Sequence, residues 1–402
     1  MTRGFRQFAF RLHTFVGRYL LIFLMLNFVT GTLVLFAPEI SLANRPDLWI
    51  KAAPGSEAAS LGQVYDNVRH EFPDARVGSL FAPARPWFGN KVYAHYPDGR
   101  AVTVWARQDT GAVAGVSENA FLIRLSEMLA GLHTNLLVPR RPAELFVTFL
   151  AVIMLGVLIT GLFSYRRFWK GFLRVPSVTT EGRMRAGTWH RLLAVWLLPF
   201  LFLMAVTGTV YFFDVLGFNQ PFPGHAPVIE RAAALPEGFA GSDIDAAVTT
   251  IRQRMPGFVP TEVALPSFKD NPIQVFGYDR ATGQNFNANI FLVDPVGAQI
   301  VGSLTPENVN TMGWMMPLVT AIHYGTWGGF ASILLWAVFG TGSALLLIMG
   351  AKVNIARNRA ASPITATGGG VRAFLNGLGW SRWVYLLFLT GIAALIIRSL
   401  LR

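Results

Sequence analysis

The chain of 402 residues contains no cysteine. This absence excludes disulfide bonds, thiolate metal sites, cysteine nucleophiles and iron–sulfur clusters held by cysteine. It also excludes covalent attachment of haem, which requires a Cys-x-x-Cys-His motif. The chemistry of this protein must therefore use side chains other than thiols.

Charged residues are scarce as well, at 14% of the chain, whereas 52% of the residues are hydrophobic. An ordinary soluble domain has about 25% charged residues. The formal net charge of +12 alone would suggest a nucleic-acid partner. The basic residues, however, lie beside long apolar runs, where they act as topology signals. The composition therefore predicts an integral membrane protein that contacts lipid and binds no nucleic acid.

Five apolar runs approach the length of about 20 residues that a membrane-spanning helix needs. The first run is too long for a signal peptide, and no small-residue cleavage site follows it promptly. The predicted order is span 1 with a cytoplasmic N-terminus (1–37), a polar domain (38–142), spans 2 and 3 with a basic loop (143–213), a second polar domain (214–329), span 4 (330–350), a basic linker (351–382) and span 5 (383–402).

The stretch 11–32 recurs, without a gap, as the stretch 188–209. The alignment places His13 over His190, and both copies end in Val-Thr-Gly-Thr. We interpret each copy as a span that begins at a histidine and ends at a small-residue turn. Parallel repeats of this kind imply a pseudo-two-fold axis along the membrane normal.

The two polar domains also repeat. Each contains a predicted helix, 61–72 in the first and 244–255 in the second, that stops at a proline, Pro73 or Pro256. Strand-like alternation and turn sequences follow in both. The predicted strands are 91–96, 101–106, 274–278 and 289–293. The predicted fold class is an α-helical integral membrane protein with a duplicated four-span core, a fifth span and two α+β domains.

The basic residues predict the orientation of the chain. The N-terminus and the loops 166–191 and 352–382 are short and basic, which places them in the cytoplasm. The two polar domains then lie on the outer side of the membrane, and so does the C-terminus after five spans.

Four of the seven histidines occupy repeated positions. His13 and His190 open spans 1 and 3 at the cytoplasmic face, and His133 and His323 precede spans 2 and 4 at the outer face. The pseudo-two-fold axis brings together the two histidines at each face. The distance from His13 to Gly31 is roughly 27 Å of helix, which separates the two pairs.

Two neutral imidazoles that face each other at one depth are the axial ligands that a six-coordinate b-type haem requires. We therefore interpret the four histidines as ligands of two b haems, with Arg11 and Arg191 positioned to pair with haem propionates. The alternative is that interfacial histidines merely extend towards water. A zinc site is a poorer interpretation, because no repeated carboxylate completes the ligand set.

At these residues the chain resembles the PepSY-associated transmembrane proteins, often called iron-regulated or iron-uptake membrane proteins. The resemblance covers residues 5–360 and leaves span 5 outside. It rests on Arg11-Leu-His13 with Gly31, Trp189-His190-Arg191 with Gly208, His133, His323, the two outer helix–strand–strand units and Arg107-Gln-Asp-Thr-Gly111.

This family includes bacterial siderophore reductases that carry b haems and reduce ferric siderophores on the periplasmic side. The resemblance implies that His13, His133, His190 and His323 are axial ligands. It also implies a bacterial inner membrane location and two PepSY-like periplasmic domains.

The first functional hypothesis is a haem electron conduit, an oxidoreductase that reduces a periplasmic ferric siderophore or other ferric chelate. No dinucleotide-binding or Walker motif is present, so quinol or a separate reductase would supply the electrons. The alternative is a non-enzymatic PepSY membrane module that binds or regulates a partner. A transporter is disfavoured because the acidic residues nearest the spans, Glu144 and Asp214, lie at span ends.

Overall fold

The computed structural model describes residues 3–117, 121–138, 141–164, 175, 177, 182–218, 235–266, 272–283, 287–361 and 370–401. The chain forms two compact units, each assembled from separate stretches of sequence. The helical unit comprises Met1–Ala37, Leu125–Leu216 and Ile322–Arg402. The sheet unit comprises Pro38–Arg124 and Gly217–Ala321.

The helical unit contains the apolar runs. Its elements are α1 (Arg3–Tyr19), α2 (Leu21–Val34), the end of α5 (Phe121–Asn135), α6 (Arg141–Ser164), α7 (Gly182–Trp196), α8 (Leu198–Phe213), the π-helical start of Asp214–Phe218, the last two residues of α10 (Thr311–His323), α11 (Gly329–Ala361), α12 (Gly370–Gly377), a 3₁₀ turn (Gly379–Ser381) and α13 (Arg382–Leu401). Among the described residues, four helices are long and apolar enough to cross a membrane, and the bent pair α1–α2 makes a fifth.

The first span is not the single helix that the sequence predicted. The chain bends by 66° between α1 and α2, at Leu20, whose backbone leaves the helical region. Each half follows a different neighbour, because α1 packs on α6 whereas α2 packs on α11. The second copy also breaks, between α7 and α8, and Pro199 lies in the first turn of α8, where proline is tolerated.

The Val-Thr-Gly-Thr segments do not form the turns that were expected. Thr30 and Thr207 lie inside α2 and α8, and each hydroxyl donates a hydrogen bond of 2.7 Å to the carbonyl four residues earlier, on Leu26 and Leu203. This back-bonding is typical of threonine within a continuing helix.

The helices contact each other in a repeated pattern. α1 packs on α6 and α7 packs on α11, while α2 packs on α11 and α8 packs on α6. A core of buried side chains joins α6, α8 and α11, and it includes Phe200 and Trp336, whose ring centroids are 5.5 Å apart. The Trp336 indole donates a hydrogen bond of 2.8 Å to the carbonyl of Ile322. α12 and α13 pack near the α1–α2 bend through Phe374 and Tyr385.

The sheet unit holds all the strands of the described chain. Its elements are α3 (Ala37–Ser41), a 3₁₀ turn (Pro46–Leu48), α4 (Leu61–Glu71), β1 (Arg76–Phe81), β2 (Asn90–His95), β3 (Ala101–Ala106), β4 (Val113–Ser117), α9 (Gly241–Arg254), β5 (Phe258–Ala264), β6 (Ile273–Asp279), a 3₁₀ turn (Arg280–Thr282), β7 (Asn289–Val293), β8 (Ile300–Leu304) and most of α10. In each insert, a helix of the sheet unit, α4 or α9, is thus followed by four strands.

The two inserts share one sheet, which differs from the two separate domains that the sequence predicted. The strand order is β4-β3-β2-β1-β5-β6-β7-β8, and the central pair, β1 and β5, is antiparallel with Leu80 opposite Val263. Neither central strand was predicted. A register shift interrupts the alternation in each, beside Gly78 in β1 and beside Pro260 in β5. Proline within a sheet is confined to such bulges and to edges.

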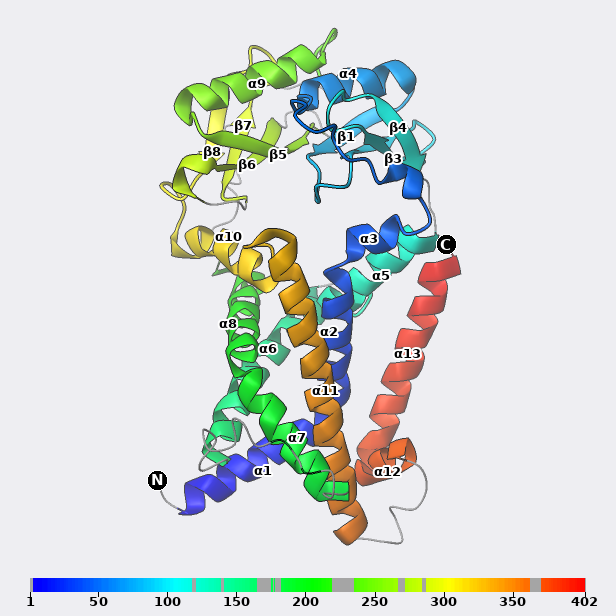
Figure 1. Cartoon of the computed structure of the whole chain (residues 1–402), viewed down its shortest axis with the longest axis vertical. Helices are drawn as coiled ribbons and strands as arrows, with labels where there is room; N and C mark the ends of the chain where they lie inside the picture. The colour runs from blue at the N-terminus through cyan, green and yellow to red at the C-terminus, as the bar shows by residue number, and fades with distance from the viewer. Residues whose placement is uncertain are drawn as a thin grey trace. The chain divides into compact units, whose positions relative to one another are not determined.

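The helices α4 and α9 lie on the same face of this sheet (Figure 1). Val64 and Val68 of α4 and Ile244 and Ile251 of α9 are buried in one continuous core. Side chains that alternate along the strands complete this core, as period-two burial requires. The predicted helices 61–72 and 244–255 are therefore present, and their apolar faces are buried together.

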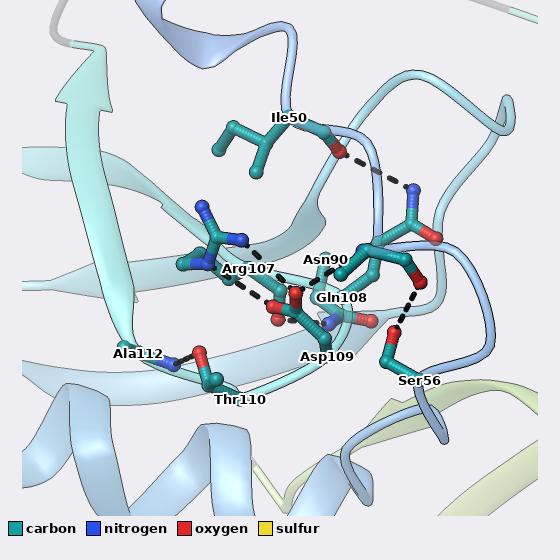
Figure 2. Close-up of polar contacts among 9 residues, drawn as sticks. Ile50, Ser56, Asn90, Arg107, Gln108, Asp109, Thr110 and Ala112 are labelled. Carbon is teal, nitrogen blue, oxygen red and sulfur yellow. Dashed lines mark hydrogen bonds and ion pairs between the residues drawn. The ribbon is translucent and has the colours of Figure 1, made fainter.

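The β3–β4 turn, residues 107–111, is hydrogen-bonded to other segments of the sheet unit, and Figure 2 shows the Gln108 side chain bonded to the Ile50 carbonyl, 3.4 Å away. Arg107 holds Asp109 through two hydrogen bonds of 3.0 and 2.9 Å. The Arg107 guanidinium thereby lowers the pKa of the Asp109 carboxyl to about 2. The Gln108 side chain donates to the carbonyls of Phe88, at 2.6 Å, and Pro86, at 3.0 Å. The contacts are those of a structural turn.

Candidate functional site: two histidine pairs in the helical unit

The structure places the four histidines of the sequence analysis in two pairs. His13 of α1 lies beside His190 of α7, with ring centroids 6.3 Å apart. His133, near the end of α5, lies beside His323, the last residue of α10, with centroids 6.2 Å apart. The pairing is the one that the repeat indicated.

The two pairs lie at different heights along α11. Trp336 of α11 bonds the carbonyl of Ile322, next to His323, whereas Leu346 of α11 bonds His190. Ten residues of helix separate these two positions, which is about 15 Å. Figure 1 shows α1 and α7 together at one end of the helical unit.

In the first pair, each ring is held against the backbone of a neighbouring helix. His13 Nδ1 lies 3.1 Å from the carbonyl oxygen of Val157 in α6. His190 Nδ1 lies 3.1 Å from that of Leu346 in α11. Gly161 and Gly350 follow these carbonyls by one helical turn, and a Cβ atom on either would stand 3.3 or 3.2 Å from the histidine ring. The absent side chain lets the ring approach the helix.

His133 repeats this arrangement on α2. Its Nδ1 lies 3.0 Å from the carbonyl oxygen of Asn27, one turn before Gly31. The Asn27 side chain returns a hydrogen bond of 3.3 Å to the His133 carbonyl. Asn27 therefore holds both the ring and the backbone of His133.

His323 departs from the pattern. Its Nδ1 lies 2.8 Å from the hydroxyl oxygen of Thr207 in α8. The Tyr211 ring stands edge-on to the imidazole, with centroids 5.3 Å apart and planes at 88°. Among the residues that the structure describes, His323 is thus the one member of the four whose ring bonds a side chain.

These contacts fix the tautomer of the rings. A carbonyl oxygen only accepts hydrogen bonds, so Nδ1 of His13, His133 and His190 must carry the proton. Nε2 of each neutral ring is then unprotonated and free to bind a metal. A hydrogen bond from the second ring nitrogen is the usual support of a metal-bound histidine.

The pairs do not extend to a conventional metal-ion site. Across the described part of the chain, no three side chains of histidine, aspartate, glutamate or cysteine gather within reach of one metal ion. Each pair therefore offers two nitrogen ligands and no carboxylate. Such a pair suits a metal whose other coordination positions are filled by a group other than protein side chains.

The two predicted arginines have different positions. Arg191 lies close enough to His190 for its charge to act on the ring. Arg11 is exposed, and among the described residues no contact joins it to either histidine. Residues that are two positions apart in an α-helix point to different sides, so Arg11 points away from the side on which His13 lies. The positive charge of Arg357 in α11 interacts electrostatically with both His13 and His190. Arg357 was not among the predicted arginines.

Several partners of the histidines were not predicted, namely Asn27, Val157, Thr207, Leu346 and Gly350. Gly161 was not linked to His13 either. The signal available in the sequence was that Gly161 and Gly350 both lie near the ends of the predicted spans 2 and 4. A carbonyl acceptor leaves no signal in the sequence, because every residue has one.

Comparison with known protein families shows to which family the chain belongs. The model of the PepSY-associated TM region matches residues 10–357. The chain belongs to the PepSY-associated transmembrane family. The match contains all four paired histidines and ends before α12 and α13. No curated protein matches the chain. Family membership and the apolar helices together make this a membrane protein with several spans.

Proposed function

We propose that the protein is a b-type haem electron-transfer protein that reduces a ferric chelate, of the ferric-siderophore type, outside the cytoplasmic membrane of a bacterium. His13 and His190 would hold one haem, and His133 and His323 the other. The electrons would come from quinol or a separate reductase.

The spacing of the paired rings supports the proposal more than any other observation. A metal–imidazole bond is about 2 Å long and the ring centre lies about 1 Å beyond the nitrogen, so two imidazoles across one metal ion have centroids about 6 Å apart. The observed separations are 6.3 and 6.2 Å. The porphyrin supplies the remaining ligands of haem iron, which agrees with pairs that contain no third ligand.

The chain's own contribution is to hold the four histidine rings and to orient them. The carbonyls of Val157, Leu346 and Asn27 keep the Nδ1 protons in place, and the glycines let the rings reach their helices. Arg357 and Arg191 provide positive charge for propionates near the first pair. When bound, haem iron supplies one-electron chemistry, which these side chains tune through hydrogen bonding and burial.

The duplicated core is part of the proposal. The contacts of α1 with α6 and of α7 with α11 match under the repeat, as do those of α2 with α11 and of α8 with α6. A pseudo-two-fold axis relates these pairs. By the basic loops, the first histidine pair lies at the cytoplasmic face and the second at the periplasmic face.

The substrate class follows from iron chemistry. One electron converts Fe(III) in the chelate to Fe(II), which is held less tightly by hard oxygen ligands. The iron is then released while the chelator stays intact. The sheet unit would face the periplasm, where such chelates arrive.

The test is an absorption spectrum of the detergent-purified protein, oxidised and dithionite-reduced, with haem quantified as the pyridine haemochrome. The proposal expects a sharp reduced α band, about two b haems per chain and oxidation of the reduced protein by a ferric chelate. A protein that contains no haem, even after expression with haem supplied, would leave a non-enzymatic PepSY binding or regulatory module as the better account.

A further inference from the structure

Three of the four paired histidines bond a backbone carbonyl through Nδ1, whereas His323, within the described part of the chain, bonds a hydroxyl. The counterpart of Asn27 in the second copy is Met204, whose carbonyl oxygen lies 3.3 Å from the Thr207 hydroxyl. His323 Nδ1 lies 2.8 Å from the Thr207 oxygen instead of bonding this carbonyl. The asymmetry singles out Thr207, which is only 3% exposed.

The hydroxyl of Thr207 has a defined polarity. Its hydrogen is directed to the carbonyl oxygen of Leu203, at 2.7 Å. The Thr207 oxygen therefore accepts, and His323 Nδ1 must donate. This arrangement gives His323 the same tautomer as the other three rings, with Nε2 unprotonated.

We propose that Thr207 is the positioning residue of His323, and that its hydroxyl sets how strongly His323 donates to the iron of the second haem. The inference rests on the proposed function. It predicts that the reduction potential of one haem, and of one only, depends on this hydroxyl.

The physical link is the hydrogen bond from Nδ1–H. Such a bond makes the opposite nitrogen a stronger donor. A stronger nitrogen donor stabilises Fe(III) relative to Fe(II) and lowers the reduction potential, since second-shell hydrogen bonds are among the protein's means of tuning haem. Removal of the acceptor should raise the potential.

The experiment compares three variants of the full-length protein. Thr207→Val removes the hydroxyl and keeps the shape, whereas Thr207→Ser keeps the hydroxyl. Thr209→Val is the matched control, because Thr209 lies two residues further along α8 and bonds its own helix in the same way. Its hydroxyl bonds the carbonyl of Ala205, at 2.7 Å, and bonds no histidine among the described residues.

The readouts are a spectroelectrochemical titration of each haem and the electron paramagnetic resonance of the ferric protein. Thr207→Val should raise one of the two potentials, by about 59 mV for each tenfold change in the relative binding of Fe(III) and Fe(II). It should also move one of the two low-spin ferric signals. Both potentials and both signals should stay at wild-type values in Thr207→Ser and Thr209→Val.

A second measurement identifies which haem responds. In a protein that also lacks His13 and His190, the remaining haem should show the same rise on Thr207→Val. Loss of this haem in Thr207→Val, with retention in Thr207→Ser and Thr209→Val, would equally support the role of Thr207.

The outcomes separate this inference from the proposed function. Wild-type protein without haem would refute the proposed function itself. Two haems in the wild type, with potentials that stay unchanged or fall in Thr207→Val, would refute only the role of Thr207. An equal shift in Thr209→Val would also overturn it, because helix back-bonding would then be the cause.

Discussion

His133 packs directly on the backbone of Gly31. A Cβ atom added to Gly31 would stand 2.6 Å from Cε1 and 2.9 Å from Nδ1 of the imidazole. The histidine can bond the Asn27 carbonyl only because residue 31 has no side chain.

Gly31→Ala should therefore displace His133 and weaken the second haem site selectively. Overpacking of this kind costs about 1–3 kcal/mol, and about 1.4 kcal/mol is a tenfold change in affinity. We expect haem content to fall towards one per chain. Pyridine haemochrome analysis of the purified variant measures the loss.

Gly156→Ala is the control for this prediction. Gly156 lies in α6, and a Cβ atom added to it would have no heavy atom of a neighbouring element within 4 Å among the described residues. The haem content of this variant should equal that of the wild type. Equal haem loss in both variants would contradict the role assigned to Gly31.

The pairing of the histidines predicts the result of double substitutions. Replacement of His13 and His190 by alanine removes both ligands of one haem, and should leave about one six-coordinate haem per chain. Replacement of His13 and His133 removes one ligand from each haem, and should leave none six-coordinate. Low-temperature spectra and haem content distinguish the two results.

His70→Ala serves as the reference, because His70 lies in α4 of the sheet unit. It should retain both haems. If the His13/His133 double variant kept one intact six-coordinate haem, the pairing indicated by the ring distances would be incorrect.

The crossing of α4 and α9 predicts a stability change. Gly62 and Gly241 approach so closely that a Cβ atom on Gly62 would overlap the Gly241 carbonyl oxygen. Carboxylates cap the facing helix starts, since the Gly62 amide donates to Asp245 at 3.3 Å and the Gly241 amide donates to Asp66 at 2.6 Å. Gly62→Ala should lower the free energy of unfolding of the sheet unit by about 1–3 kcal/mol.

Thermal unfolding followed by circular dichroism measures this loss in the full-length protein. Gly78→Ala is the comparison, because its added methyl group would meet its nearest neighbour, the Tyr93 carbonyl oxygen, at an ordinary 3.6 Å. A melting temperature for Gly62→Ala as high as that of Gly78→Ala would argue against the close crossing.

The ion pair in the β3–β4 turn predicts a dependence on pH. Hydrogen bonds from Arg107 lower the pKa of Asp109 to about 2, below the value of about 3.9 expected in an unfolded chain. A depressed carboxyl pKa stabilises the folded state above about pH 4, and the contribution is lost as the pH falls towards about 2. Asp109→Asn should therefore be less stable than the wild type near pH 6, and the difference should largely vanish near pH 2.

Melting temperatures of both proteins between these pH values test the prediction. Asp98→Asn is the matched change, because Asp98 and Arg100 form an exposed pair at 3.8 Å, which contributes little. Its curve should parallel that of the wild type. A constant difference between Asp109→Asn and the wild type at every pH would exclude this explanation.

Local patterns in the sequence were sufficient to predict much of the helical unit. Apolar runs longer than about 20 residues identify spans without any knowledge of packing. The expectation of PepSY-associated membership is confirmed, as are the membrane helices and the presence of a β-sheet. The repeat of His13 at His190 indicated which histidines would meet, because related positions in a duplicated chain lie at the same depth.

The tertiary structure alone decided how the histidines are held and how the strands join. The acceptors on Val157, Leu346 and Asn27 are backbone oxygens, which every residue possesses, so only helix packing selects them. The bend at Leu20 and the β1–β5 pairing likewise depend on neighbours distant in sequence. Patterns in the amino-acid sequence reflect local conformational preferences. These contacts, in contrast, depend on which helices and strands pack together in the tertiary structure.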